Sequence, residues 1–335
     1  MFSKFSKIIT AIFTIALLTA TIGCSNDSKY VTIETEALGT FAQIKCNTTI
    51  TQSELTSLIH NIDTEAKNSM SIFAEDSLLS KINNNETDSL DHHLIYNIEL
   101  AKRFNKLSGG AYDITIKPLT DAWGFGRNRA TTEPNIDSII QFVGHELISI
   151  DNNKIIKQDP RVQIDLNSIA KGYTVDLVAN QLEALGIEDY MVNIGGEIRC
   201  QGYNPNKERW SIGIETPYDG NMAMDSFEKI VRIENKAVAT SGNYRRFYLT
   251  EDGKKVVHTI NPISGYSVVS GLLSATIVAP TCAEADAAAT MFMSIGATAD
   301  IEELAAKCEK EYGWKYYFIF ASGNDYRIAC SEEFK

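Results

Sequence analysis

The stretch IDLNSIAKGYTVD, residues 164–176, carries the transition from a strand-like segment into a helix. Asp165 precedes the helix, and Lys171 and Gly172 lie in its first turn. Apolar residues then recur three or four positions apart, which predicts a buried helix face, and Gly186 supplies a stop signal. Asp165 is either a helix cap or a ligand for a charged group, and the stretch alone leaves both interpretations open.

The segments on both sides of this stretch predict an α+β fold with a largely antiparallel sheet flanked by helices, because strands follow one another in hairpins more than in βα alternation. Period-two alternation and turn-forming glycines predict strands over residues 29–47, 147–166, 190–202, 210–216, 229–242, 274–280 and 315–323. Helical spacing predicts helices over residues 51–68, 87–110, 169–186, 284–296 and 301–313. No internal repeat or long linker divides the chain, so we expect a single domain over residues 31–335.

The composition is that of a folded globular protein, with 44% hydrophobic and 22% charged residues among 335. The formal net charge is −12, from 31 basic and 43 acidic residues. This charge argues against nucleic acid as a partner, because affinity for nucleic acid comes largely from lysine and arginine on phosphates.

The N-terminus has the pattern of an export signal, in which Lys4 and Lys7 precede an uncharged apolar run over residues 8–23. The run ends in Thr-Ile-Gly-Cys, which resembles a bacterial lipobox and predicts cleavage before Cys24 and lipidation of that residue. An ordinary signal peptide cleaved nearby is the alternative. Polar residues 24–30 are expected to form a short tether to a lipid anchor in the bilayer.

Signatures of several common sites are missing from the sequence. The cysteines after Cys24 are scattered and include no C-x-x-C or Cys/His spacing, which argues against zinc. H-E-x-x-H, G-x-S-x-G and G-x-G-x-x-G do not occur, and WGFG at residues 123–126 contains only G-x-G. His92 and His93 are neighbours on a predicted helix, where their side chains are expected to point apart, so no joint metal site is expected.

Polar residues instead gather at the ends of predicted elements, beside glycines. Asp113 follows a Gly-Gly pair, and His258 ends a strand before an Asn-Pro turn. Asp286 and Thr290 lie four apart, on one helix face. Carboxylate and hydroxyl oxygens are hard ligands that suit Mg²⁺ together with substrate phosphates. Each residue also has an ordinary interpretation: a cap for Asp113, a turn for His258, a solvated carboxylate for Asp286 and a bond to its own helix for Thr290.

Taken together and in this order, eight segments resemble the ApbE family of flavin transferases. They are ALGTFAQI (37–44), SIFAEDSLLSKIN (71–83), SGGAYDITIKPLTDAWGFG (108–126), IDLNSIAKGYTVD (164–176), VNIGGEIRCQG (192–202), AVATSGNYRRF (237–247), HTINPISGYSV (258–268) and ADAAATMFMSIG (285–296). The resemblance spans roughly residues 30–330 and implies an ApbE-like, T-fold-like domain. It also implies Mg²⁺-dependent transfer of FMN from FAD to a threonine or serine hydroxyl of a target protein, through a phosphoester bond and with release of AMP.

Carried over residue by residue, the resemblance implies a flavin site, a metal site and catalytic residues. The positions that match the FAD site are Leu38, Phe73, Ala111, Tyr112, Asp113, Asp165, Lys171 and Ile260. The implied Mg²⁺ ligands are the backbone carbonyl of Ser168 and the side chains of Asp286 and Thr290. His258 and Asp286 are the implied catalytic residues, which help to remove the proton from the acceptor hydroxyl.

Three positions depart from the family pattern, which commonly has methionine at position 38, tyrosine at 73 and Gly-Gly or Gly-Ala at 167–168. This chain has Leu38, Phe73 and Asn167-Ser168. A carbonyl ligand does not depend on its side chain, so the change at 168 is expected to leave the metal site intact. Phe73 keeps an aromatic stacking face and loses a hydroxyl.

Two other functions stay open. With water as the acceptor, the same site would be a Mg²⁺-dependent FAD pyrophosphatase that releases FMN and AMP. Without turnover, the chain would be a lipid-anchored flavin-binding protein. For the transferase, the resemblance implies acceptors among flavoprotein subunits of membrane redox complexes, of the sodium-pumping quinone reductase (Nqr) or Rnf type. It also implies a location in the bacterial cell envelope, on the periplasmic face of the inner membrane.

Overall fold

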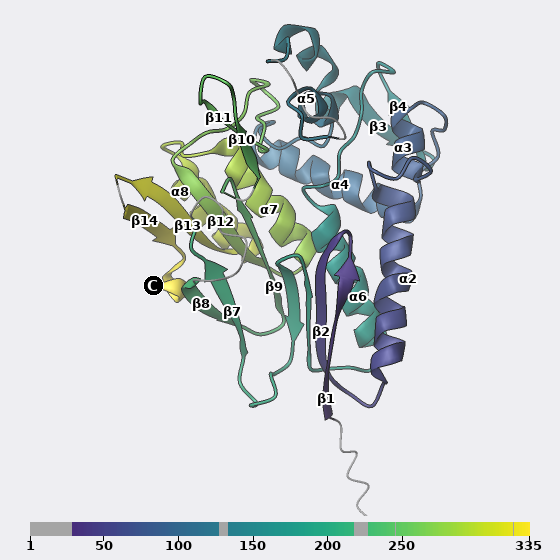
Figure 1. The fold of residues 1–335 in the computed structure, drawn as a ribbon, viewed down its shortest axis with the longest axis vertical. Helices are drawn as coiled ribbons and strands as arrows, with labels where there is room; N and C mark the ends of the chain where they lie inside the picture. The colour runs from purple at the N-terminus through teal and green to yellow at the C-terminus, as the bar shows by residue number, and fades with distance from the viewer. Residues whose placement is uncertain (1–28, 127–132, 218–226, 245, 324) are drawn as a thin grey trace, which may run out of the picture.

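The computed structural model describes residues 29–126, 133–217, 227–244, 246–323 and 325–335 (Figure 1). Its centre is an eight-stranded sheet with the strand order β1-β2-β5-β6-β9-β12-β13-β14. The strands are β1 Lys29–Ala37, β2 Thr40–Thr48, β5 Tyr190–Ile194, β6 Glu197–Gln201, β9 Lys236–Gly242, β12 Leu272–Ala279, β13 Lys315–Ser322 and β14 Asp325–Cys330. Neighbouring strands in this sheet pair antiparallel, which confirms the predicted fold class. β1 begins at Lys29, two residues before the expected start of the domain.

The long helices gather on one face of this sheet, as Figure 1 shows for α2, α6 and α7. They are α2 Gln52–Met70, α4 His92–Leu107, α6 Ala170–Ala184, α7 Cys282–Ile295 and α8 Ile301–Tyr312. Local sequence sets their starts. Thr51 and Glu54 form a capping box at the start of α2, and the Asp91 side chain accepts a hydrogen bond from the Leu94 N–H at 2.9 Å at the start of α4.

The other face of the sheet is covered by a separate hairpin, β7 Trp210–Glu215 and β8 Phe227–Ile233. Ile212 and Val231 of this hairpin share a hydrophobic cluster with Val238 and Ile319 of the main sheet. The expectation that these two strands continue the main sheet is therefore wrong. Their alternating pattern fits any half-buried strand, and only packing decides which sheet the strand joins.

Helices α6 and α7 cross at unusually close range. Gly172 makes this possible, because a Cβ built there would lie 2.3 Å from the Cys282 carbonyl oxygen. α7 is rich in fully buried alanines, which leave room for neighbours on several sides. The close crossing brings the first turn of α6 against the first two turns of α7.

A smaller group of elements lies beyond one end of the sheet, near the top of Figure 1. It includes α5 Lys117–Ala122, the hairpin β10 Phe247–Leu249 and β11 Lys255–Val257, and the hairpin β3 Ile148–Asp151 and β4 Lys154–Lys157. The remaining short helices are α3 Leu78–Asn83, η1 Ile136–Ser138, η2 Ile140–Phe142, η3 His145–Leu147 and η4 Glu332–Phe334. Leu119, Trp123 and Val256 belong to a separate small core in this group. Among the described residues, no helix has the length and apolar character needed to cross a bilayer.

Candidate functional site

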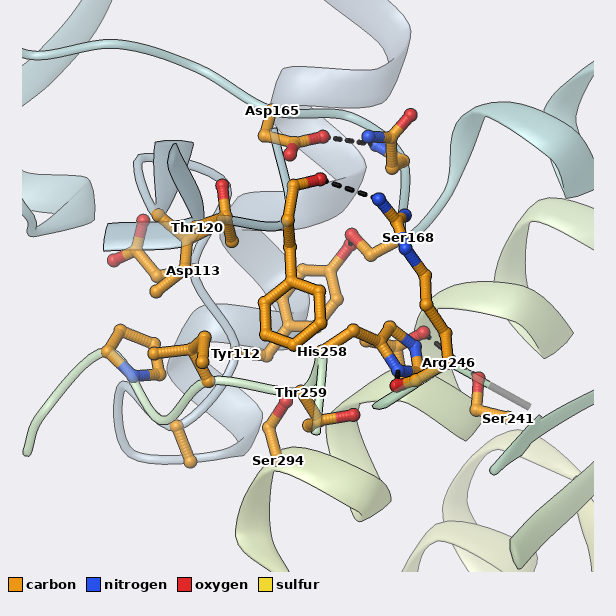
Figure 2. Close-up of a pocket in the computed structure, with 17 residues that line it drawn as sticks. Tyr112, Asp113, Thr120, Asp165, Ser168, Ser241, Arg246, His258, Thr259 and Ser294 are labelled. Atoms are coloured by element: carbon orange, nitrogen blue, oxygen red, sulfur yellow. Dashed lines mark hydrogen bonds between the residues drawn. The ribbon is translucent and has the colours of Figure 1, made fainter. Parts of the chain in front are cut away.

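A cavity of about 140 Å³ opens where this small group meets the main domain (Figure 2). The cavity is lined by residues of the loop before α6, the segment around α5, the end of β11 and the second half of α7. The predicted site residues that line it are Ala111, Tyr112, Asp113, Asp165, Ser168, His258, Ile260 and Thr290. The other lining residues are Ile116, Thr120, Phe125, Asn167, Ser241, Arg246, Thr259, Pro262 and Ser294. Pockets for drug-sized ligands hold roughly 300–1,000 Å³, so a dinucleotide must extend beyond this cavity.

Tyr112 and Ser168 join two of the walls. The Tyr112 hydroxyl lies 2.8 Å from the Ser168 Oγ, and burial raises the pKa of Tyr112 far above its ordinary value. The phenol therefore stays protonated and hydrogen-bonded. The Ser168 side chain is engaged with Tyr112, so it is the backbone at 168 that is available for the ligand role that the resemblance implies.

Asp165 and Asp113 are buried carboxylates that hold local turns. Asp165 Oδ1 accepts the Asn167 N–H at 2.8 Å, and Asp113 Oδ1 accepts the Thr115 N–H, also at 2.8 Å. Ile169 is the N-cap residue of α6 and makes no side-chain cap bond, so Asp165 does not cap that helix. Burial raises the pKa of both carboxyls.

His258 lies just beyond β11, in the cavity wall. Its Nδ1 lies 3.2 Å from the Arg246 carbonyl oxygen, and a carbonyl only accepts, so Nδ1 carries the proton. Burial lowers the pKa of His258 to about 4. The ring is therefore neutral at physiological pH, and its Nε2 has a free lone pair that can accept a proton.

Arg246 and Phe125 contribute groups that the sequence analysis did not assign. The Arg246 guanidinium donates to the Phe125 carbonyl at 2.6 Å, and its carbon lies 5.8 Å from the centre of the Phe125 ring. Figure 2 shows Arg246 next to His258, and the centres of the Phe125 and His258 rings are 6.3 Å apart. An arginine in a cavity wall suits a phosphate. The sequence signal for each is its place in a segment that resembles the ApbE family, AVATSGNYRRF for Arg246 and SGGAYDITIKPLTDAWGFG for Phe125.

Asp286 is buried beneath this cavity, at 4% exposure, with Thr290 one turn later on α7. Its Oδ2 accepts the Gly172 N–H at 3.0 Å across the close crossing with α6. The Thr290 hydroxyl lies 3.1 Å from the Ser241 Oγ of β9. The alternative of a solvated Asp286 is therefore wrong, and Thr290 reaches across to the sheet.

Negative charge accumulates around Asp286. Glu197 is 4% exposed, and its Oε1 lies 2.5 Å from the Lys171 Nζ, while its Oε2 is buried without a hydrogen-bond partner among the described residues. Burial raises the pKa of Asp286 to about 8, with repulsion from Glu197 as the next contribution and attraction by Lys171 opposing it. The two buried carboxylates of Asp286 and Glu197 lie near one lysine, and one Glu197 oxygen has no hydrogen-bond partner among the described residues. This arrangement suits a hard cation, which would offset the excess negative charge.

Two residues implied for the flavin site do not line this cavity. Leu38 lies in the β1–β2 turn at φ 52°, where its N–H donates to Asp63 Oδ1 at 2.6 Å. Phe73 follows α2 and is 52% exposed. Lys171, also implied for the flavin site, is likewise absent from the cavity lining, and its Nζ pairs with the Glu197 carboxylate. Cys24 falls outside the described residues.

Comparisons with known proteins agree with this architecture. A family model described as the ApbE family matches residues 38–314. The chain is 32% identical to the FAD:protein FMN transferase of Haemophilus influenzae over 348 residues, which cover 98% of this chain and 97% of that protein. It is 32% identical to the protein of the same name from Vibrio cholerae over 296 residues, or 84% of this chain and 86% of the relative.

Solved structures give the same result. The flavin transferase ApbE from Vibrio cholerae matches with a TM-score of 0.81 at 30% identity, over 91% of this chain and 98% of that structure. The apbe protein from Thermotoga maritima matches with a TM-score of 0.79 at 27% identity, over 91% and 98% of the two chains. By sequence and by fold, the chain belongs to the ApbE family.

Proposed function

We propose that this protein transfers FMN from FAD to a target protein, as the names of its relatives state for them, and that the acceptor group is a threonine or serine hydroxyl. The observation that carries the proposal is the cavity itself. It brings Tyr112, Ser168, His258 and Thr290, which lie far apart in the sequence, around one space that adjoins a buried carboxylate pair.

The proposed reaction is a phosphoryl transfer. The acceptor hydroxyl oxygen forms a bond to the phosphorus that carries the riboflavin, the bond from that phosphorus to the AMP oxygen breaks, and AMP leaves with the electron pair. Little covalent chemistry is asked of the protein, so its contribution is positioning and charge stabilisation.

We assign a magnesium site to Asp286, Thr290 and the Ser168 carbonyl. Mg²⁺ bound there would neutralise charge on the pyrophosphate and on the departing AMP. Asp286 suits this role because burial and repulsion from Glu197 raise its pKa, and a bound cation would favour its charged form. The Gly172 N–H holds its carboxylate in place, and Lys171 supplies further positive charge close to the start of α6.

His258 is the proposed base. Its Nδ1 is held by the Arg246 carbonyl, which orients Nε2 to take the proton of the acceptor hydroxyl. Arg246 holds its guanidinium in the cavity wall, where it suits a phosphate oxygen of FAD.

We further propose a periplasmic location, with the chain anchored through a lipid on Cys24 at the inner membrane. The lipobox-like Thr-Ile-Gly-Cys sequence supports it. The acceptors would then be flavoprotein subunits of Nqr-type or Rnf-type complexes, exposed on the same side of the membrane.

The direct test is mass spectrometry of an acceptor fragment after incubation with this protein, FAD and Mg²⁺. We expect an adduct with the mass of FMN on one threonine or serine, equal release of AMP, and loss of both products when Mg²⁺ is chelated. A parallel reaction without acceptor separates the alternatives. Rapid release of free FMN and AMP there would identify a pyrophosphatase, and stable FAD binding without any AMP would identify a flavin-binding protein.

A further inference from the structure

A second cluster of metal-ligating side chains lies away from the flavin cavity, between α2 and the start of α4. Glu65 projects from α2, and His92 and His93 are the first two residues of α4. One potential ligand atom from each of the three lies within 4.8 Å of the others. The ring centres of the two histidines are 3.8 Å apart, so the expectation that neighbouring side chains point apart is wrong here.

The spacing matches a small coordination sphere. His93 Nε2 and Glu65 Oε1 are 3.0 Å apart. Two ligand atoms on a tetrahedral zinc at about 2.0–2.1 Å are separated by about 3.3 Å, so a movement of a few tenths of an ångström admits the ion. Two imidazoles and a carboxylate favour zinc-like or copper-like ions over magnesium, which prefers oxygen ligands alone.

His93 is oriented as a metal ligand usually is. Its ring is buried, and its other nitrogen, Nδ1, lies 2.9 Å from the Tyr173 hydroxyl. The Tyr173 hydroxyl can accept a hydrogen bond from Nδ1–H, and this arrangement leaves a free lone pair on Nε2. A hydrogen bond at the second ring nitrogen fixes the tautomer that presents Nε2 to an ion.

The surroundings leave room for water and supply compensating charge. Glu65 and His92 are exposed and line an open hollow of about 450 Å³, together with Asn68 and Asp91. The partial positive charge at the start of α4 disfavours a bound cation, and the negative charges of Glu65 and Asp91 offset this repulsion. None of these residues lines the flavin cavity.

We propose that Glu65, His92 and His93 form a site for one divalent transition-metal ion, with His93 oriented by Tyr173 and solvent completing the coordination. The site is independent of the magnesium site at Asp286. It does not require that the proposed flavin transfer be correct.

The test is equilibrium dialysis of the untagged protein against Zn²⁺ in buffer with excess Mg²⁺, which occupies the oxygen-rich site. We expect one Zn²⁺ per chain, with Kd below about 100 μM. His92→Ala and Glu65→Gln change exposed side chains, and each is expected to weaken Zn²⁺ binding by about 10–100-fold, as loss of a metal-site partner commonly does. Co²⁺ in place of Zn²⁺ should give visible absorption bands that both variants lose.

His60→Ala is the matched control, since His60 is also exposed on α2 but bonds Thr35 outside the cluster. It should bind Zn²⁺ as the unmodified protein does, and thermal melting should show all variants folded. Equal Zn²⁺ affinity in the unmodified protein, His92→Ala and Glu65→Gln would overturn the proposal. So would the absence of Zn²⁺ binding up to millimolar concentration.

Discussion

At Asp286, two buried carboxylates share one lysine. The Lys171 Nζ lies 2.5 Å from the Glu197 Oε1, and the Gly172 N–H donates a hydrogen bond to the Asp286 carboxylate. Burial and then repulsion from Glu197 raise the pKa of Asp286, and this shift links stability to function. In the metal-free protein a proton neutralises this carboxyl, and a cation would take the place of that proton.

Asp286→Asn is therefore expected to abolish FMN transfer and to stabilise the metal-free protein. The folded-state pKa is about 8 and the unfolded carboxyl titrates near 3.8, so the unmodified protein loses stability as pH rises through this window. The loss is up to about 1.4 kcal/mol per pH unit, and asparagine avoids it. Denaturant unfolding at pH 5 and pH 8, with and without Mg²⁺, measures the effect. A variant that is less stable than the unmodified protein at pH 8 without Mg²⁺ would contradict it.

His258→Gln is expected to lower kcat by about 10²–10⁴-fold while FAD still binds. The lowered pKa of His258, about 4, means that the neutral form dominates at every pH above that value. The acid limb of kcat/KM attributed to this base should therefore lie below pH 5. An acid limb near pH 6.5 that disappears in the variant would show that the ring is not desolvated in the free enzyme.

At the scale of elements, the contact between helices α6 and α7 holds the site together. Gly172 allows the close approach, and Asp176, one turn later, accepts the Cys282 N–H at 2.9 Å and the Ala283 N–H at 2.8 Å. A side chain from one helix thus satisfies free N–H groups at the start of the other. Arg199 of β6 completes the arrangement at 3.0 Å from Asp176.

Asp176→Asn should destabilise the protein by about 2–4 kcal/mol, because an amide cannot accept both N–H bonds and leaves the Arg199 charge without its buried partner. Glu183→Gln is the matched control. Glu183 also pairs with Arg199, at 2.9 Å, but its side chain is 33% exposed, so the expected cost is below about 1 kcal/mol. Urea unfolding of the two variants measures the difference. Equal losses would mean that Asp176 does not hold α7.

At the scale of the molecule, the cavity lies between the main domain and the small group around α5, β10 and β11. Arg246 and Trp123 make hydrogen bonds within the small group, and Asn261, in the loop after β11, reaches α7 by donating to the Ser294 carbonyl at 3.3 Å. A ligand that fills this junction adds contacts to both sides. Binding should therefore raise the stability of the whole fold.

FAD at 100 times its Kd is expected to add about 2.7 kcal/mol to the free energy of unfolding, because it binds only the folded protein. The measurement is thermal melting with FAD and Mg²⁺ together and separately. Asp286→Asn should lose the Mg²⁺-dependent part and keep a response to FAD alone. An unchanged melting temperature at high FAD concentration would mean that the folded protein does not bind FAD in preference to the unfolded chain.

Much of the fold could be predicted from the sequence, because the local spacing of apolar residues indicates both hairpin strands and the buried faces of helices. The spans of β1, β2, α2 and α6 follow from alternation, caps and glycine stops. The separate β7–β8 sheet could not be predicted, since the same alternation suits either sheet. The positions of Leu38 and Phe73 relative to the cavity were equally out of reach, because they depend on how distant loops pack.

The sequence by itself determined the order of the main elements, the family and eight of the seventeen residues that line the cavity. The tertiary structure alone decided the chemical state of those residues. The pKa of Asp286 is raised by burial and by Glu197 beside it, and the pKa of His258 is lowered because desolvation disfavours its charged form. It also decided that Glu65 meets His92 and His93. The periodicity of apolar residues reports local structure over a few residues of chain. The pKa of a buried group depends instead on its desolvation and on every charge that folding brings near it.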